Sequence, residues 1–201
     1  MLQKKLKKFL KMNPEKLKYN KIIELMPKGK LKILDAGCGE GGVSNLLNKR
    51  GYVVRGFDKE KGDISKAIRK YNGIPFEVKD ALNVDYSGYD AIIAWGLFEY
   101  VLEIDRLLNK IKKEMKKDSV LLFSVPNVCS LSKRFKCLMG VNPNRERIPH
   151  LTFTFLEAIN LLRKHGFQIK KVTSLGYDGV KGFYFPTPKN LSSEIVIKVT
   201  K

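Results

Sequence analysis

Three glycines at alternate positions follow a short apolar run, and their spacing suits a ligand-binding loop. The run at residues 31–34 ends in Asp35, and Gly37, Gly39 and Gly41 come directly after it. A glycine backbone can pass close to a ligand because no side chain stands in the way. A helical pattern begins after the loop, and the free N–H groups of a helix start point toward the same place. The spacing therefore predicts a cradle for a nucleotide-like molecule.

The glycine loop has three interpretations. It can bind a nucleoside without phosphate, it can bind a dinucleotide, or it can be a turn that binds nothing. The spacing Gly37-x-Gly39-x-x-Gly42 also fits the fingerprint of dinucleotide-binding dehydrogenases, whose ligand carries a pyrophosphate. Asp35 argues against it, because a carboxylate at the strand end would repel phosphates, and the extra Gly41 departs from the pattern. The third interpretation is a tight turn without a ligand. It is disfavoured because three alternate glycines would each weaken a purely structural turn.

The elements that must position this loop follow an alternating order. Apolar runs and helical patterns alternate from residue 31 onward, which predicts a parallel sheet with helices on both faces. Strands are expected at residues 32–35, 52–57, 75–78, 89–94, 120–125, 167–174 and 194–199. Helices are expected from the loop through residue 48, from an Asp63 cap to about residue 71, and at residues 104–115 and 155–164. Residues 126–150, rich in Pro, Asn and Arg, carry no expected element.

The N-terminal segment precedes this alternation. An amphipathic helix is expected at residues 2–11, and Asn13-Pro14 predicts the start of a second helix that runs to about residue 26. We therefore expect basic helices in residues 1–29 to cap a single domain formed by residues 30–201.

Acidic residues recur at the expected strand ends. In an open parallel sheet, ligands bind beyond the carboxyl ends of the strands. Asp58 ends the second strand, nineteen residues after Gly39, and its carboxylate can accept hydrogen bonds from both hydroxyls of a ribose. Asp80 follows the third strand and Trp95 follows the fourth. Each acid singly is also a common cap or turn residue, but their joint occurrence favours one binding site.

These strand-end positions resemble class I S-adenosylmethionine-dependent methyltransferases over residues 31–201. The resemblance implies an α/β fold, with a Rossmann-like, doubly wound, seven-stranded sheet that is mostly parallel and has an antiparallel last strand. It implies that Asp58 holds the ribose, that Asp80 reaches the adenine amino group and that the Ala94-Trp95 segment lines the methionine part of the donor. The implied cofactor-binding set is Asp35, Gly37, Cys38, Gly39, Gly41, Asp58, Lys59, Asp80, Ala81, Ala94 and Trp95. The product would be S-adenosylhomocysteine.

The second half of the chain looks like small-molecule methyltransferases related to the ubiquinone-biosynthesis O-methyltransferases. Those often show Glu-His after strand four, whereas this chain has Glu99-Tyr100, and we predict no metal site. Glu99 and Tyr100 are acceptor-side candidates, with helix-start residues as the alternative. His150 lies after strand five, over the expected acceptor pocket, where it either contacts substrate as a base or anchors its loop.

Composition limits the remaining classes. The chain has 201 residues, 43% of them hydrophobic, as expected for a globular domain. The sequence contains no run of eighteen apolar residues, so no membrane span is expected. The basic N-terminus lacks the features of a secretory signal. The odd number of cysteines and the absence of a CxxC spacing predict free thiols in a reducing cytoplasm.

The formal net charge of +19 raises the question of an anionic partner such as RNA. Eight of the 39 basic residues are Arg, and a Lys-biased composition without function is the alternative. The segment Ala94-Trp95-Gly96-Leu97 lacks the Asn/Asp-Pro-Pro-aromatic tetrad typical of enzymes that methylate base amino groups. The sequence therefore favours a methyltransferase acting on a small-molecule or lipid-like acceptor. An RNA methyltransferase and a methyltransferase-fold binding protein are the alternatives.

Overall fold

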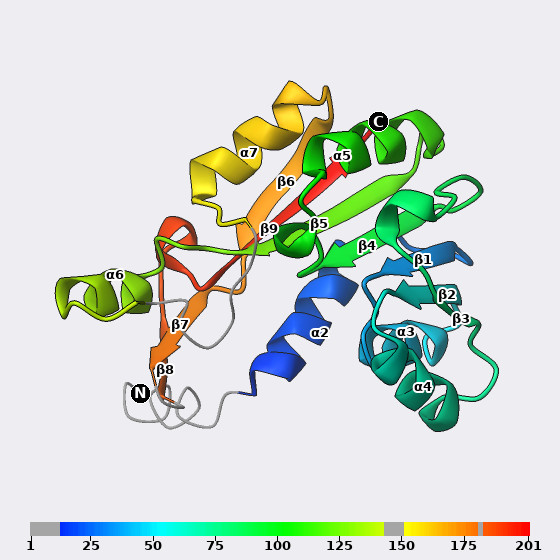
Figure 1. Ribbon diagram of the computed structural model, residues 1–201, viewed down its shortest axis with the longest axis horizontal. Helices are drawn as coiled ribbons and strands as arrows, with labels where there is room; N and C mark the ends of the chain where they lie inside the picture. Colours follow the sequence, from blue (N-terminus) through cyan, green and yellow to red (C-terminus); the bar gives the residue numbers. More distant parts are fainter. Residues whose placement is uncertain (1–12, 143–150, 181–182) are drawn as a thin grey trace.

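A seven-stranded sheet runs through the centre of the protein in the order β3-β2-β1-β4-β5-β9-β6 (Figure 1). The computed structural model describes residues 13–142, 151–180 and 183–201. The strands are β1 (Lys32–Ala36), β2 (Val53–Asp58), β3 (Phe76–Val78), β4 (Ala91–Trp95), β5 (Val120–Pro126), β6 (Gln168–Ser174) and β9 (Glu194–Thr200). β9 is antiparallel to both of its neighbours, β5 and β6, and the other described pairings in this sheet are parallel. The predicted sheet, with its antiparallel last strand, is confirmed.

Helices cover both faces of this sheet (Figure 1). They are α2 (Pro14–Leu25), α3 (Gly42–Asn48), α4 (Lys61–Lys70), α5 (Ile104–Glu114) and α7 (Phe155–Lys164). A further helix, α6 (Leu131–Leu138), lies beyond the end of the sheet (Figure 1). Buried residues of α5 and α7 share one apolar cluster with the sheet, and those of α2 and α3 share a second cluster. The sheet is therefore the middle layer of three, and its strands are apolar on both faces.

β4 shows how the sequence produces these layers. Successive side chains of a strand point to opposite faces. Ile92 and Ala94 accordingly lie in the cluster beneath α5 and α7, whereas Ile93 and Trp95 lie in the cluster beneath α2 and α3. All five residues of β4 are buried, as expected for an inner parallel strand covered on both sides.

Most expected elements match the structure to within a residue or two. Asn13 caps α2 as predicted, accepting a hydrogen bond from the backbone N–H of Glu15 at 2.9 Å. The expected helix at residues 2–11 lies outside the described residues. Within them, no helix combines the length and the apolar character needed to span a bilayer. Cys38, Cys129 and Cys137 are free thiols, as predicted.

Three expectations are wrong. Glu60, not Asp63, is the N-cap of α4, so that Asp63 lies inside the first helical turn. Residues 126–150 were expected to carry no element, but they contain α6. The loop between the last two strands of the sheet contains a separate hairpin of β7 (Tyr177–Val180) and β8 (Phe183–Pro186). The start of α6 bonds to the distant Asp178, whereas β7 and β8 are close in sequence and pair with each other.

Tyr86 links the core to the carboxyl edge of the sheet. Its ring is fully buried edge-on to Phe57, with ring centroids 6.3 Å apart, and its hydroxyl donates to the carbonyl oxygen of Ala81 at 2.9 Å. We expect Tyr86→Phe to lower the free energy of unfolding by about 1 kcal/mol, because the buried Ala81 carbonyl loses its donor. Chemical denaturation measures this difference. A variant as stable as the wild-type protein would show that the hydroxyl contributes nothing.

Candidate active site

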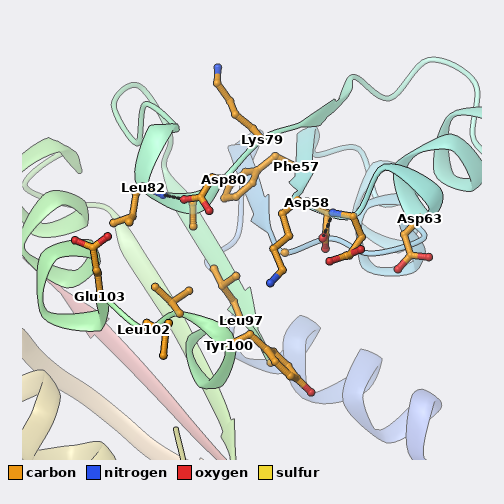
Figure 2. A pocket seen from close by; sticks show the side chains of 16 residues that line it. Phe57, Asp58, Asp63, Lys79, Asp80, Leu82, Leu97, Tyr100, Leu102 and Glu103 are labelled. Carbon is orange, nitrogen blue, oxygen red and sulfur yellow. Dashed lines mark hydrogen bonds between the residues drawn. The ribbon is translucent and has the colours of Figure 1, made fainter. Parts of the chain in front are cut away.

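A cavity of about 530 Å³ opens at the carboxyl ends of β1, β2, β3 and β4 (Figure 2). This is the edge where the sequence predicted a binding site, and the volume suits a nucleoside-sized ligand. Six of the predicted site residues line it: Gly37, Asp58, Lys59, Asp80, Ala81 and Tyr100. The remaining lining residues are Phe57, Glu60, Asp63, Lys79, Leu82, Gly96, Leu97, Val101, Leu102 and Glu103.

The glycine loop turns tightly at the end of β1. Gly37, Gly39 and Gly41 all have positive φ, at 71°, 53° and 79°, which is the region that favours glycine. The backbone N–H groups of Gly37 and Cys38 both donate to the carbonyl oxygen of Phe57 at 2.9 Å, so the loop is fixed to the end of β2. A Cβ atom added at Gly37 would stand 3.2 Å from Cδ1 of Leu97, which also lines the cavity. The backbone therefore approaches the cavity where a side chain would fill it.

Asp58 stands between this loop and the start of α4. Its Oδ2 accepts the backbone N–H of Gly39 at 2.9 Å, and its Oδ1 accepts the backbone N–H of Glu60 at 3.0 Å (Figure 2). These two bonds orient the carboxylate at the cavity wall, and a carboxylate has further lone pairs for hydroxyl donors. Asp58 can therefore bind a diol without first changing its own position.

Asp80 occupies the corresponding place after β3. Its Oδ1 accepts the backbone N–H of Leu82 at 2.8 Å and so caps a 3₁₀ turn at Ala81–Asn83. Asp80 thus has the capping role that was the structural alternative for each acid taken singly. The carboxylate nevertheless also lines the cavity, where its second oxygen is available to an amino group.

Asp35 lies behind the loop rather than at the cavity wall. It is 2% exposed, and the Ser44 hydroxyl donates to its Oδ2 at 2.6 Å. Burial raises the pKa of this carboxyl to about 6, against the hydrogen bond from Ser44 and the nearby ammonium of Lys18. The pKa of Asp35 therefore lies close to neutral pH, and a neighbouring cation would favour the ionised carboxylate.

The charges of the cavity decide which kind of nucleotide it suits. Two lysines line it, Lys59 and Lys79, and Lys79 is paired with Glu77 at 3.0 Å. Five acids line it: Asp58, Glu60, Asp63, Asp80 and Glu103. A wall with this excess of carboxylates repels a pyrophosphate and favours a ligand that is uncharged or cationic. This finding weighs against a dinucleotide.

The other predicted donor-side residues do not line this cavity. Ala94 is in the core beneath α5, and Cys38, Gly39 and Gly41 lie in or behind the loop. Trp95 was expected to wall the donor pocket, but its indole lies on the α2 side of the sheet because its side chain alternates with that of Ala94. The ammonium of Lys18 stands 5.4 Å from the centroid of its ring system.

The acceptor-side candidates separate in the structure. Tyr100 lines the cavity, whereas Glu99 is 3% exposed and is not part of its wall. Oε1 of Glu99 stands 3.4 Å from where a Cβ atom at Gly96 would lie, so this carboxylate is behind the cavity floor. His150 lies outside the described residues. In the described part of the chain, no group of three or more His, Cys, Asp and Glu residues is arranged to hold a metal ion.

Glu194 is a charged residue near this edge that sequence reasoning missed. Glu194 begins β9, and its carboxylate accepts from the Ser124 hydroxyl. Burial raises its pKa, opposed by that hydrogen bond and by Lys18. Lys133 of α6 has its pKa lowered by burial, partly offset by Asp178. Because an antiparallel strand begins at the edge where parallel strands end, the first residue of the last strand could have been added to the strand-end set.

The fold and the acid-lined cavity are those of a class I S-adenosylmethionine-dependent methyltransferase, whose methyl donor is a nucleoside without phosphate. A protein-family model described as "Methyltransferase domain" matches residues 2–172, and the chain belongs to this family.

Named relatives agree with this assignment. The ubiquinone biosynthesis O-methyltransferase of Pelagibacter ubique is 25% identical over 163 residues, which are 76% of this chain and 68% of that protein. The enzyme of the same name from Coxiella burnetii is 32% identical over 129 residues, 61% of this chain and 54% of its own length. The chain thus spans about half the length of the Coxiella relative.

A solved structure shows the shared fold. Magnesium protoporphyrin IX methyltransferase from Synechocystis PCC 6803 with bound S-adenosylhomocysteine superposes with a TM-score of 0.68 at 16% identity. The superposition covers 94% of this chain and 83% of that chain.

Proposed function

We propose that this protein transfers a methyl group from S-adenosylmethionine to a small, hydroxyl-bearing or lipid-like acceptor by direct in-line displacement. The observation that most supports this proposal is the acid-lined cavity beside the glycine loop, which suits a cationic nucleoside and not a dinucleotide. The likeness to ubiquinone biosynthesis O-methyltransferases supports a hydroxyl acceptor.

Three acids bind different parts of the donor: Asp58 and Asp80 at the cavity wall, and Asp35 behind the glycine loop. Asp58 accepts from the ribose hydroxyls, and Asp80 accepts from the adenine amino group beside the backbone of Ala81. Asp35 attracts the ammonium of the donor's amino-acid end, which lies past the backbone of Gly37, where no side chain intervenes. When bound, the donor supplies an activated methyl group on its sulfonium, so the main tasks of the protein are to align the two reactants and to exclude water.

The acceptor side of this cavity is mainly apolar. Leu97, Val101 and Leu102 line it together with Tyr100, whose hydroxyl can hydrogen-bond a polar group of the acceptor. A hydroxyl acceptor must lose its proton during transfer. His150 stays our candidate for this role on the sequence argument alone.

Asp35 gives this proposal a pH dependence. Its pKa is raised from 3.8 to about 6, so the free protein loses stability from this group as pH rises between these values. A donor ammonium, which stays protonated below about pH 7, favours the ionised carboxylate. We therefore expect S-adenosylhomocysteine to bind more tightly as pH rises from about 5 to about 7.

The variant Asp35→Asn separates these two effects. It should flatten the pH dependence and weaken binding about fivefold at neutral pH, because the charge interaction with the ammonium is lost. It should also stabilise the free protein at neutral pH, because the buried charge is removed. Calorimetric titration across the pH range and thermal unfolding test both. An unchanged pH profile would contradict the role of Asp35.

The proposed reaction is tested by transfer of a labelled methyl group. The purified protein is incubated with S-adenosylmethionine carrying a labelled methyl group, and with either a panel of catechols and long-chain phenols or total RNA. Label in the phenolic products, absent with Asp58→Ala, supports the proposal. Label in RNA and in none of the small molecules would contradict it and favour the nucleic-acid alternative.

A further inference from the structure

The face of α6 that points away from the sheet is apolar and exposed. Leu131, Phe135 and Leu138 recur at the spacing of one helical face and are 42%, 61% and 84% exposed. Met139 and Val141 extend this surface, at 66% and 46%. We call these five residues the α6 patch. The other exposed large apolar residues in the described part of the chain are scattered over separate elements, so the patch is a feature to be explained.

α6 is held in this orientation from its other side. The backbone N–H and the hydroxyl of Ser132 both donate to the buried carboxylate of Asp178 on β7, at 2.5 and 2.7 Å. Nε of Arg134 donates to the carbonyl oxygen of Cys129 at 2.9 Å. Figure 1 shows α6 at one end of the molecule, next to the β7–β8 hairpin and away from the sheet. The patch is therefore the outer face of an anchored helix and not a piece of core.

The surroundings of the patch are basic. Residues 127–142 contain Lys133, Arg134 and Lys136 and no acid, in a chain of net charge +19. Arg134 is exposed and Lys136 is half-exposed on the same helix. Like charges disfavour a second copy of this chain on the patch, whereas an anionic surface is attracted. The apolar residues of the patch require a binding partner with an anionic surface and an apolar layer below it.

We infer that the α6 patch docks on the surface of an anionic lipid bilayer. A short helix with an apolar face and flanking basic residues can lie in the interface, with its side chains among the acyl chains and its cations at the headgroups. Neither the strand-end cavity nor a smaller cavity of about 200 Å³ beside α2 is lined by a patch residue. The patch therefore lies outside both cavities, and a deformable bilayer can cover it without a shaped groove.

The position of α6 gives the docking a consequence. α6 follows β5, so it leaves the sheet at the same carboxyl edge that carries the cavity. A docked bilayer would therefore face the edge that a lipid-like acceptor has to reach. This consequence rests on the proposed function, whereas the docking does not.

Vesicle flotation with the full chain tests the inference. The probes are vesicles of phosphatidylcholine alone and of phosphatidylcholine with phosphatidylglycerol in equal parts. We expect binding to the anionic vesicles only, decreasing as salt is raised. The double variant Phe135→Ser with Leu138→Ser should lower the partition coefficient at least about tenfold, because two exposed apolar side chains no longer insert.

Matched controls separate the patch from general surface properties. Ile68→Ser with Leu156→Ser removes two apolar side chains of similar exposure on α4 and α7 and should bind vesicles like the wild-type chain. Lys136→Glu should weaken binding more than Lys117→Glu, which changes the net charge equally at a distant exposed site. Binding of S-adenosylhomocysteine should be unchanged in the patch variants, which shows that they fold.

Three results would overturn the inference. The first is that the wild-type chain binds neither kind of vesicle. The second is that the patch variant binds as well as the wild type, so that the general basic charge accounts for retention. The third is a self-association seen by analytical ultracentrifugation that the patch variant abolishes, which would assign the patch to a second copy of the chain.

Discussion

Replacing Asp58 by alanine is expected to weaken binding of S-adenosylhomocysteine about a hundredfold or more. The proposed ribose contact places two hydroxyl donors on one carboxylate, and a hydrogen bond to a charged group contributes about 1.5–3 kcal/mol. The same carboxylate orients the Gly39 and Glu60 backbone at the cavity wall, at 2.9 and 3.0 Å, so the loop loses its anchor as well. Isothermal calorimetry of the purified variant measures the effect.

Asp118→Ala is the matched control, because it removes an exposed carboxylate far from the cavity lining. It should bind the donor product like the wild-type protein. Thermal unfolding of both variants separates lost binding from lost folding. If Asp58→Ala folds and binds within about threefold of wild type, the ribose assignment is wrong.

Gly37→Ala is expected to have the second large effect, on binding and on stability together. Gly37 has φ of 71°, and a Cβ atom there would stand 3.2 and 3.3 Å from two side-chain atoms of Leu97. The left-handed backbone costs an L-residue about 1–2 kcal/mol. The added methyl group also crowds Leu97 at the cavity lining, so we expect donor-product affinity to fall at least about tenfold.

Gly88→Ala isolates the backbone cost. Gly88 has a similar φ of 79°, and a Cβ atom there meets nothing within 4 Å. Denaturation should therefore show a loss of about 1 kcal/mol in this control, with donor-product affinity unchanged. Equal binding by Gly37→Ala and Gly88→Ala would show that the close approach at Gly37 is not used by the ligand.

The donor half of the site was accessible to sequence reasoning because its determinants are local. The glycine loop, Asp58 and Asp80 each lie at the end of an expected strand or within two residues of it, and a parallel sheet brings these ends to one edge. The structure brings Asp58, Asp80 and Gly37 together around one cavity, as this argument requires.

Trp95 shows where the argument from strand ends was too coarse. Two consecutive residues of a strand point to opposite faces, so Ala94 and Trp95 could not both face one pocket. The period of two in β4 contained this information. The structure has Trp95 beneath α2, in contact range of Lys18.

Two features missed by sequence reasoning, the anchoring of α6 and the position of Glu194, depend on the pairing of distant segments. The N-terminus of α6 bonds to Asp178, which lies forty-six residues further along the chain, and α6 presents its apolar residues to the outside. Glu194 reaches the carboxyl edge only because β9 runs antiparallel. The bond to Asp178 leaves no local signature in the sequence, whereas the position of Glu194 follows once the last strand is expected to be antiparallel.

The most direct measurement is a crystal structure of the protein with S-adenosylhomocysteine bound. The account predicts the ribose hydroxyls on the Asp58 carboxylate, the adenine amino group at Asp80 and the amino-acid end passing the backbone of Gly37 toward Asp35. A donor product found in the smaller cavity beside α2, or in the strand-end cavity without contact to Asp58, would contradict it.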